Sequence, residues 1–227
     1  IKTATLKGSS FYFKIKENME RKRGKFIVFD GLDGSGKGVQ AKKLHNYLFD
    51  KDKKNHVLLT REPYYSEYYD EIRRILRESK NPKDNAERLA ELFVADRKEH
   101  IKLLQPDLAE GIYVVCDRYK YSTLAYQQTQ GVPLKKLIAM HEGVLVPDLV
   151  LIADVPAEVA MKRIAEDAGR EYKEVFEDLE FQGQLRKNFL ALPNQLPNER
   201  IIVIDGNRPV NEVFESVKVE VDKLLAA

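Results

Sequence analysis

The residues most able to do chemistry lie in one glycine-rich stretch near the start of the chain. Residues 31–38 read GLDGSGKG, and Lys37 is their cation. Glycines let backbone N–H groups turn inward around an anion, and a helix that starts behind them adds a partial positive charge. A lysine at the end of such a loop reaches the outer phosphates of a nucleoside triphosphate. The pattern predicts a phosphate-binding loop, the alternative being a glycine-rich turn that happens to precede a helix.

The position after Lys37 departs from the usual form of this loop. A Ser or Thr normally stands there and places its hydroxyl on Mg²⁺. This chain has Gly38, followed by Val39. Three explanations stay open: a water fills the gap, carboxylates elsewhere hold Mg²⁺, or catalysis is weakened.

The elements that must position this loop follow from the hydrophobic pattern. Short, apolar, β-branched runs alternate with longer amphipathic stretches such as 41–50 and 86–104. Buried strands joined by crossover helices are typical of a parallel sheet that helices cover on both faces. The runs that predict the five strands are 25–29, 57–60, 112–116, 149–152 and 201–204.

Charged residues and glycines gather directly after these predicted strands. In an open parallel sheet, ligands bind beyond the carboxyl ends of the strands. We therefore expect these segments to meet at one edge of the sheet and to form the functional site. The segments are 30–38, 61–63, 117–119, Asp154 and 205–206.

Composition argues against several classes of protein. The 227 residues carry 38 Lys plus Arg against 36 Asp plus Glu, whereas a protein that coats nucleic acid needs a large basic excess. No apolar run approaches the roughly 20 residues that cross a bilayer. The single cysteine, Cys116, lies in an apolar run, so we expect a buried core thiol and a reducing, cytoplasmic location.

We expect one domain over residues 24–227. Residues 1–23 are basic and lie outside the strand-and-helix pattern, so they are interpreted as an N-terminal arm or as added residues. A small insertion at about 165–176 is interpreted as a lid.

Several further motifs resemble those of the thymidylate kinase family of P-loop nucleoside monophosphate kinases. They are REP at 61–63, LFVADR at 92–97, DRYKYSTLAYQ at 117–127 and DVPAEVA at 154–160. The resemblance runs from about Lys25 to the C-terminus. It implies a P-loop NTPase-type three-layer α/β sandwich, with a five-stranded parallel sheet between helices, and ATP-dependent phosphorylation of dTMP to dTDP for dTTP synthesis. It also implies ATP and Mg²⁺ as cofactors and a homodimer.

The resemblance assigns residues to the acceptor nucleotide. Phe93 and Arg97 are four apart, so on a helix they share a face, where a ring can stack on a pyrimidine and a guanidinium can donate to its carbonyl edge. Arg118 would hold the monophosphate, and Tyr126 would crowd the 2′ position of the sugar. Core packing and a structural ion pair are the alternatives. The predicted dTMP-binding residues are Asp33, Arg61, Pro63, Phe93, Arg97, Arg118, Ser122, Thr123 and Tyr126.

The donor side and the catalytic groups follow in the same way. The predicted ATP-binding residues are Gly31, Leu32, Asp33, Gly34, Ser35, Gly36, Lys37, Gly38 and Val39. Mobile arginines that close over the donor stabilise the charge of the transferring phosphoryl group. The predicted catalytic set is Lys37, Arg118, Arg163, Arg170 and Asp33, with Lys173 a weaker lid candidate. Glu177 would help to position Mg²⁺ or the base. Solvated helix charge is the alternative for each lid residue.

One segment departs from the family pattern and leaves the acceptor open. Tyr64-Tyr65-Ser66 stands where many members have Gly-Gly-Thr, and Tyr68 and Tyr69 follow. These tyrosines could line a nucleotide pocket, pack a dimer face or cap a helix. Besides dTMP phosphorylation, two hypotheses therefore stay open. One is a kinase for another pyrimidine deoxynucleotide such as dUMP, and the other is a nucleotide-binding protein with weak catalysis because of Gly38.

Overall fold

The structure is a computed structural model and describes residues 22–166, 176 and 178–226. Five strands in this part of the chain form one parallel sheet in the order β2-β3-β1-β4-β5. The strands are β1 (Phe26–Gly31), β2 (Val57–Arg61), β3 (Tyr113–Asp117), β4 (Leu149–Asp154) and β5 (Ile201–Asp205). The predicted sheet is therefore confirmed, and each strand runs one or two residues further toward its carboxyl end than predicted.

The strands run on because the charged residues at their ends still pair in the ladder. Arg61 is in register with Asp117, and Asp154 is in register with Asp205. A charged side chain can end a buried strand when its backbone stays hydrogen-bonded and the side chain reaches the rim of the sheet.

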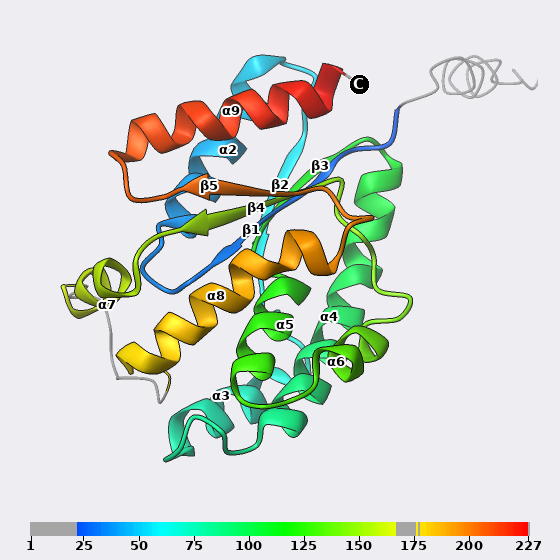
Figure 1. Cartoon of the computed structure of the whole chain (residues 1–227). Coiled ribbons are helices and arrows are strands. Elements are labelled where there is room, and N and C mark those ends of the chain that lie inside the picture. The colour runs from blue at the N-terminus through cyan, green and yellow to red at the C-terminus, as the bar shows by residue number, and fades with distance from the viewer. Residues whose placement is uncertain (1–21, 167–175, 177, 227) are drawn as a thin grey trace, which may run out of the picture.

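Helices cover both faces of the sheet (Figure 1). On one face α2 (Lys37–Lys51) packs beside α9 (Val210–Ala226), and their apolar residues share a cluster with the sheet. The other face is covered mainly by α4, α5 and α8, with α3 and α6 outside them. The remaining helices of the described chain, α7 among them, have the bounds α3 (Tyr69–Glu78), α4 (Ala86–Ala109), α5 (Lys120–Thr129), α6 (Leu134–Met140), α7 (Ala157–Ala165) and α8 (Leu179–Gln195).

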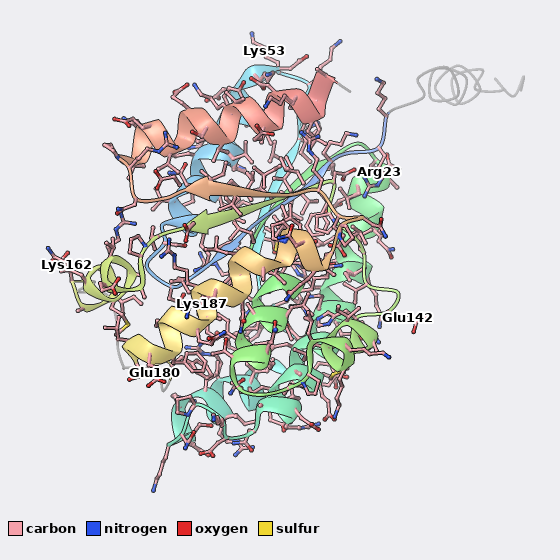
Figure 2. All side chains as sticks on the ribbon, viewed as in Figure 1. Arg23, Lys53, Glu142, Lys162, Glu180 and Lys187 are labelled. Atoms are coloured by element: carbon pink, nitrogen blue, oxygen red, sulfur yellow. The ribbon has the colours of Figure 1, made fainter. Side chains whose placement is uncertain are left out.

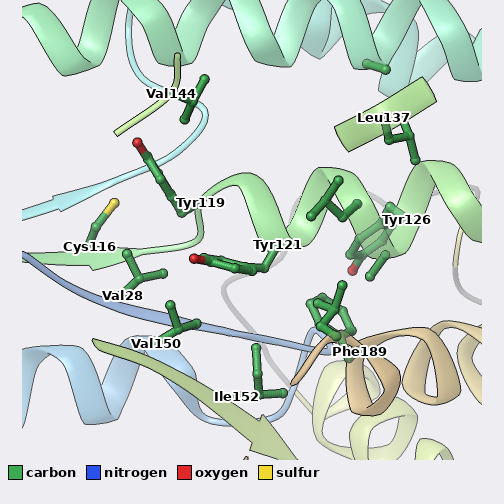
Figure 3. Packing of buried hydrophobic residues seen from close by; sticks show 14 of the residues in the cluster. Val28, Cys116, Tyr119, Tyr121, Tyr126, Leu137, Val144, Val150, Ile152 and Phe189 are labelled. Atoms are coloured by element: carbon green, nitrogen blue, oxygen red, sulfur yellow. The ribbon is translucent and has the colours of Figure 1, made fainter. Parts of the chain in front are cut away.

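The central strand β1 shows why the core has two halves. Phe26 and Val28 belong to the cluster under α4, α5 and α8, whereas Ile27 and Phe29 belong to the cluster under α2 and α9. Successive side chains of a strand point to opposite faces, so a strand in the middle of a covered sheet must be apolar throughout. Figure 3 shows the first cluster, where Val28 lies near Cys116, whose buried position was predicted.

Charged side chains lie on the outside of both layers. Lys53, Glu142, Lys162 and Glu180 project from the periphery of the molecule in Figure 2. At the start of the described chain, Arg23 donates to Asp148 at 2.8 Å, and the same carboxylate accepts from Phe26 N at 2.7 Å. These contacts hold Arg23 against the start of β4. The other residues of the predicted arm, apart from Lys22, lie outside the described residues.

Candidate active site

The phosphate-binding loop connects β1 to α2, as predicted. Gly34 and Gly36 adopt left-handed φ angles of 74° and 88°, a conformation that glycine adopts without strain. A Cβ atom on Gly34 would also collide with the backbone carbonyl of Ala160. The turn therefore requires glycine at Gly34 for two reasons, and its backbone N–H groups precede the N-terminus of α2, where anions bind.

Two cations from different elements meet on the carboxylate of Asp33. Lys37 Nζ donates to Leu32 O at 3.0 Å and lies 3.2 Å from Asp33 Oδ1. The guanidinium of Arg118, which follows β3, pairs with the same oxygen, and Tyr126 OH donates to Asp33 Oδ2 at 2.9 Å. Burial alone would raise the pKa of Asp33, but Arg118 and Lys37 together lower that pKa well below its ordinary value. The loop thus brings two cations to one point, where two phosphates could approach each other.

A buried carboxylate holds the turn that carries Arg118. Asp30 is fully buried and accepts from Tyr119 N at 3.1 Å and from the backbone and hydroxyl of Ser122 at 2.9 and 2.5 Å. Burial raises the pKa of Asp30. Ser122 Oγ in turn accepts from Arg118 Nη1 at 3.1 Å. The left-handed φ of 73° at Arg118 is therefore anchored on both sides, and its side chain is aimed at the loop.

A pocket of about 580 Å³, partly open to solvent, lies beside these residues. Most of the predicted acceptor residues line this pocket. They are Asp33, Pro63, Phe93, Arg97, Arg118, Ser122, Thr123 and Tyr126. Sequence reasoning missed the other lining residues as pocket residues, namely Glu62, Arg73, Leu76, Tyr119, Gln127 and Phe176. Three of them, Glu62, Tyr119 and Gln127, belong to the REP and DRYKYSTLAYQ motifs. Their positions in these motifs could therefore have identified them as pocket residues.

Arg61, which was predicted to bind the acceptor, does not line the first pocket. Its side chain is exposed and lines a second pocket of about 910 Å³, together with Gly38, Asp117, Tyr64 and Tyr65. The reason is the pleat of β2: Arg61 and Glu62 are neighbours at the strand end, so their side chains point in opposite directions. Glu62 lines the first pocket, which holds most of the predicted acceptor residues, and Arg61 does not.

The tyrosine-rich segment is held by α4. Asp96 accepts from Tyr64 N at 2.7 Å and from Ser66 Oγ at 2.6 Å. The ring of Tyr64 stacks on His100 with centroids 4.7 Å apart. Tyr65 is 79% exposed and lies against Tyr69. Tyr64, Tyr65 and Tyr69 thus line the second pocket, outside the pocket of Phe93 and Arg97.

One predicted lid arginine contacts the phosphate loop. Arg163, on α7, donates to Gly34 O at 3.3 Å and to Gly206 O at 3.4 Å. Gly206 follows β5, and a Cβ atom there would lie 3.2 Å from Ser35 O. Both α7 and the segment after β5 therefore approach the phosphate loop. Arg170, Lys173 and Glu177 lie outside the described residues.

Comparison with known proteins decides the family. A family model described as thymidylate kinase matches residues 29–217. The chain belongs to the thymidylate kinase family. It is 42% identical over 185 residues to a probable thymidylate kinase of Pyrococcus horikoshii, which covers 79% of this chain and 88% of the relative.

Two further relatives agree along most of their length. A probable thymidylate kinase of Methanococcus maripaludis is 40% identical over 207 residues, covering 88% of this chain and 96% of the relative. A thymidylate kinase of Dinoroseobacter shibae is 40% identical over 199 residues, covering 86% of this chain and 94% of the relative. The described helices of this family member include none that is long and apolar enough to span a membrane.

Asp117 lies beside the phosphate loop of this thymidylate kinase family member, next to Gly38. A Cβ atom on Gly38 would lie 2.9 Å from Asp117 Oδ2, and Asp117 Oδ1 is buried without a hydrogen-bond partner among the described residues. The described chain contains no cluster of three or more His, Cys, Asp or Glu side chains that could hold a metal ion. Mg²⁺ needs no such cluster, because it binds through one or two carboxylates and the phosphates of the substrate. The residues present thus fit a nucleotide-borne Mg²⁺.

Proposed function

We propose that this protein transfers the γ-phosphoryl group of ATP to dTMP and forms dTDP and ADP. The observation that carries the proposal is the meeting of Lys37 and Arg118 on Asp33, with the phosphate loop on one side and the acceptor pocket on the other. Lys37 belongs to the phosphate loop and Arg118 lines the neighbouring pocket. This arrangement fits a donor phosphate and an acceptor phosphate that face each other.

The reaction needs little besides position and charge. A phosphate oxygen of dTMP attacks the γ-phosphorus, and the bond between that phosphorus and the β–γ bridging oxygen breaks. The attacking group is already an anion, so no strong base is required. Lys37 would leave Leu32 O for the β- and γ-phosphates, and Arg118 would exchange Asp33 for the acceptor phosphate as a two-pronged donor. Arg163, which contacts Gly34 O, would neutralise charge on the transferring group.

We propose that Asp117 and the ATP phosphates hold Mg²⁺. When bound, the ion would neutralise charge on the donor phosphates. The support is the buried, unpartnered Oδ1 of Asp117 and the close approach of Oδ2 to Gly38. In this arrangement the Asp117 carboxylate occupies the space that a Ser or Thr side chain would otherwise reach. Among the three explanations for Gly38, this favours the one in which carboxylates elsewhere hold Mg²⁺.

Pyrimidine recognition would use Phe93 and Arg97, which line the pocket from the same face of α4. We further propose a cytoplasmic homodimer that binds nucleotides and neither nucleic acid nor membrane. The family resemblance supports the dimer, and the near balance of charge and the buried Cys116 support the rest. Sedimentation of the purified protein tests the dimer.

A substrate panel at several Mg²⁺ concentrations tests the function. We expect transfer from ATP to dTMP, weaker transfer to dUMP and little to purine monophosphates. Preference for dUMP would move the assignment to another pyrimidine deoxynucleotide. ATP binding without transfer above background would establish a nucleotide-binding protein instead. A preferred purine acceptor would contradict the roles of Phe93 and Arg97.

A further inference from the structure

A buried histidine contacts the arginine at the base end of the acceptor pocket. His141 follows α6 directly and is 7% exposed. Its Nδ1 lies 2.7 Å from Leu137 O, and its Nε2 lies 2.8 Å from Arg97 Nη1. A carbonyl only accepts and a guanidinium only donates. The ring must therefore be neutral, with its proton on Nδ1 and an accepting Nε2.

The remaining contacts of Arg97 explain why this acceptor matters. Arg97 is 2% exposed, and both its Nε and its Nη2 contact the same oxygen, Glu62 Oε2, at 2.7 and 2.6 Å. Because both contacts are to one oxygen, the guanidinium can still rotate about that oxygen. A bidentate pair, in which the two N–H groups bind two different carboxylate oxygens, would prevent this rotation. Within the described residues, Thr123 Oγ1 at 3.3 Å and His141 Nε2 at 2.8 Å are the contacts that oppose this rotation.

The surroundings hold every other part of this group in place. Glu62 Oε1 accepts from His100 Nδ1 at 3.2 Å, so the carboxylate is fixed from behind. The ring of Tyr119 lies under the guanidinium, 5.1 Å from Arg97 Cζ. Figure 3 shows Tyr119 directly after β3, with its hydroxyl pointing toward the segment of Val144. The shorter of the two contacts that set the rotation of Arg97 is therefore the one to His141.

The contacts of Arg97 leave one of its N–H groups without an acceptor in the described part of the chain. A guanidinium has five N–H groups. In the described part of the chain, four are used: Nε–H and one Nη2–H on Glu62, the second Nη2–H on Thr123, and one Nη1–H on His141. The second Nη1–H is left on a residue that lines the acceptor pocket.

We propose that His141 is a positioning residue for acceptor selectivity: by accepting one Nη1–H of Arg97, it holds the other toward a pyrimidine carbonyl. This inference rests on the proposed function. A donor aimed at the 4-position favours a 4-oxo pyrimidine such as thymine over a 4-amino pyrimidine such as cytosine, because an amino group would oppose it with a second donor. Free rotation of the guanidinium would weaken that discrimination.

Two amide variants separate the two bonds of His141. In His141→Gln the side-chain oxygen can reach the position of Nε2 and accept from Arg97. In His141→Asn the shorter amide can reach the position of Nδ1 and serve Leu137 O but leaves Nη1 without an acceptor. We expect His141→Asn to raise KM for dTMP about tenfold, and the ratio of kcat/KM for dTMP over dCMP to fall by about tenfold. The kcat for dTMP and KM for ATP should stay within about twofold, and His141→Gln should keep most of the selectivity.

The control is His45→Gln, a partly exposed histidine on α2 whose ring contacts Asn46. Thermal melting of all variants measures the structural cost separately. The inference would be wrong if wild type and His141→Asn had the same selectivity for dTMP over dCMP, or if the Asn and Gln variants lost selectivity equally. In either case, wild-type activity on dTMP would still support the proposed function. A wild type without dTMP transfer would overturn both.

Discussion

A Cβ atom on Gly38 would lie 2.9 Å from Oδ2 of Asp117. Real Cβ atoms do not approach an oxygen this closely without a shift, so any larger residue at Gly38 must displace the Asp117 carboxylate. The lack of a side chain at Gly38 and the position of the Asp117 carboxylate are therefore linked, because Gly38 leaves space for Asp117 beside the loop.

Gly38→Ala and Gly38→Thr should consequently differ. Alanine displaces Asp117 and adds no ligand, so the Mg²⁺ concentration for half-maximal activity should rise about tenfold. Threonine displaces it equally but adds a hydroxyl that can bind the metal or donate to Asp117, so its Mg²⁺ requirement should lie below that of alanine. Mg²⁺ titrations of activity, with Mn²⁺ binding as a direct readout, check this. Identical curves for wild type and Gly38→Ala would show that Asp117 does not serve the metal.

Arg118→Lys should damage the acceptor side selectively. Lysine keeps the charge but loses the planar fork that can donate to two phosphate oxygens. We expect kcat/KM for dTMP to fall about 30-fold, or about 2 kcal/mol, with KM for ATP nearly unchanged.

The matched control is Arg163→Lys, because Arg163 contacts the phosphate loop at Gly34 O and does not line the acceptor pocket. It should lower kcat and change the ATP dependence more than the dTMP dependence. Steady-state kinetics with each substrate varied in turn distinguishes the two. If both variants affected ATP and dTMP alike, the separate roles of the two arginines would be wrong.

How far the sequence could predict this site depends on the range of the contacts. The loop ending at Lys37 was predictable because its chemistry is local: glycines, a strand before and a helix after. Strand ends were less predictable, since the ladder continues through Arg61 and turns its side chain away from the acceptor pocket. The contact between Arg97 and His141 spans 44 positions and follows from the packing of α6 against α4, which hydrophobic periodicity alone does not reveal.

Phe93 and Leu92 are adjacent in the sequence but lie in different surroundings. Leu92 is 2% exposed in the core, whereas Phe93 is partly buried and lines the acceptor pocket. Leu92→Ala should lower the free energy of unfolding by about 2–5 kcal/mol through loss of buried volume. It should leave KM for dTMP of the folded protein nearly unchanged.

Phe93→Ala should cost less stability and raise KM for dTMP about tenfold, because it removes the stacking ring. Chemical denaturation measures the first effect and steady-state kinetics the second. Unchanged KM in Phe93→Ala, with stability lost as in Leu92→Ala, would return Phe93 to ordinary core packing.

His141 should make stability depend on pH in a defined window. Burial, followed by the charges of Arg97, Lys120 and Lys98, lowers the pKa of His141 to about 3, while its bond to Leu137 O acts in the opposite direction. In the unfolded chain its pKa is about 6.5. Above 6.5 the ring is neutral in both states, so its contribution to stability is fully present there. As pH falls below 6.5, the unfolded chain takes up the proton first, and stability should fall by up to about 1.4 kcal/mol per pH unit until about 3.

The difference between wild type and His141→Gln isolates this contribution from the carboxylates that titrate in the same range. Denaturant unfolding from pH 7.5 to 4.5 should show the variant losing stability more slowly than wild type, with the two curves parallel above about 7. The NMR signal of the His141 ring should show no protonation step between pH 5 and 8. A midpoint near 6.5 would mean that the ring becomes a cation beside Arg97, and the Nε2 acceptor would then be lost at the pH where the enzyme is assayed.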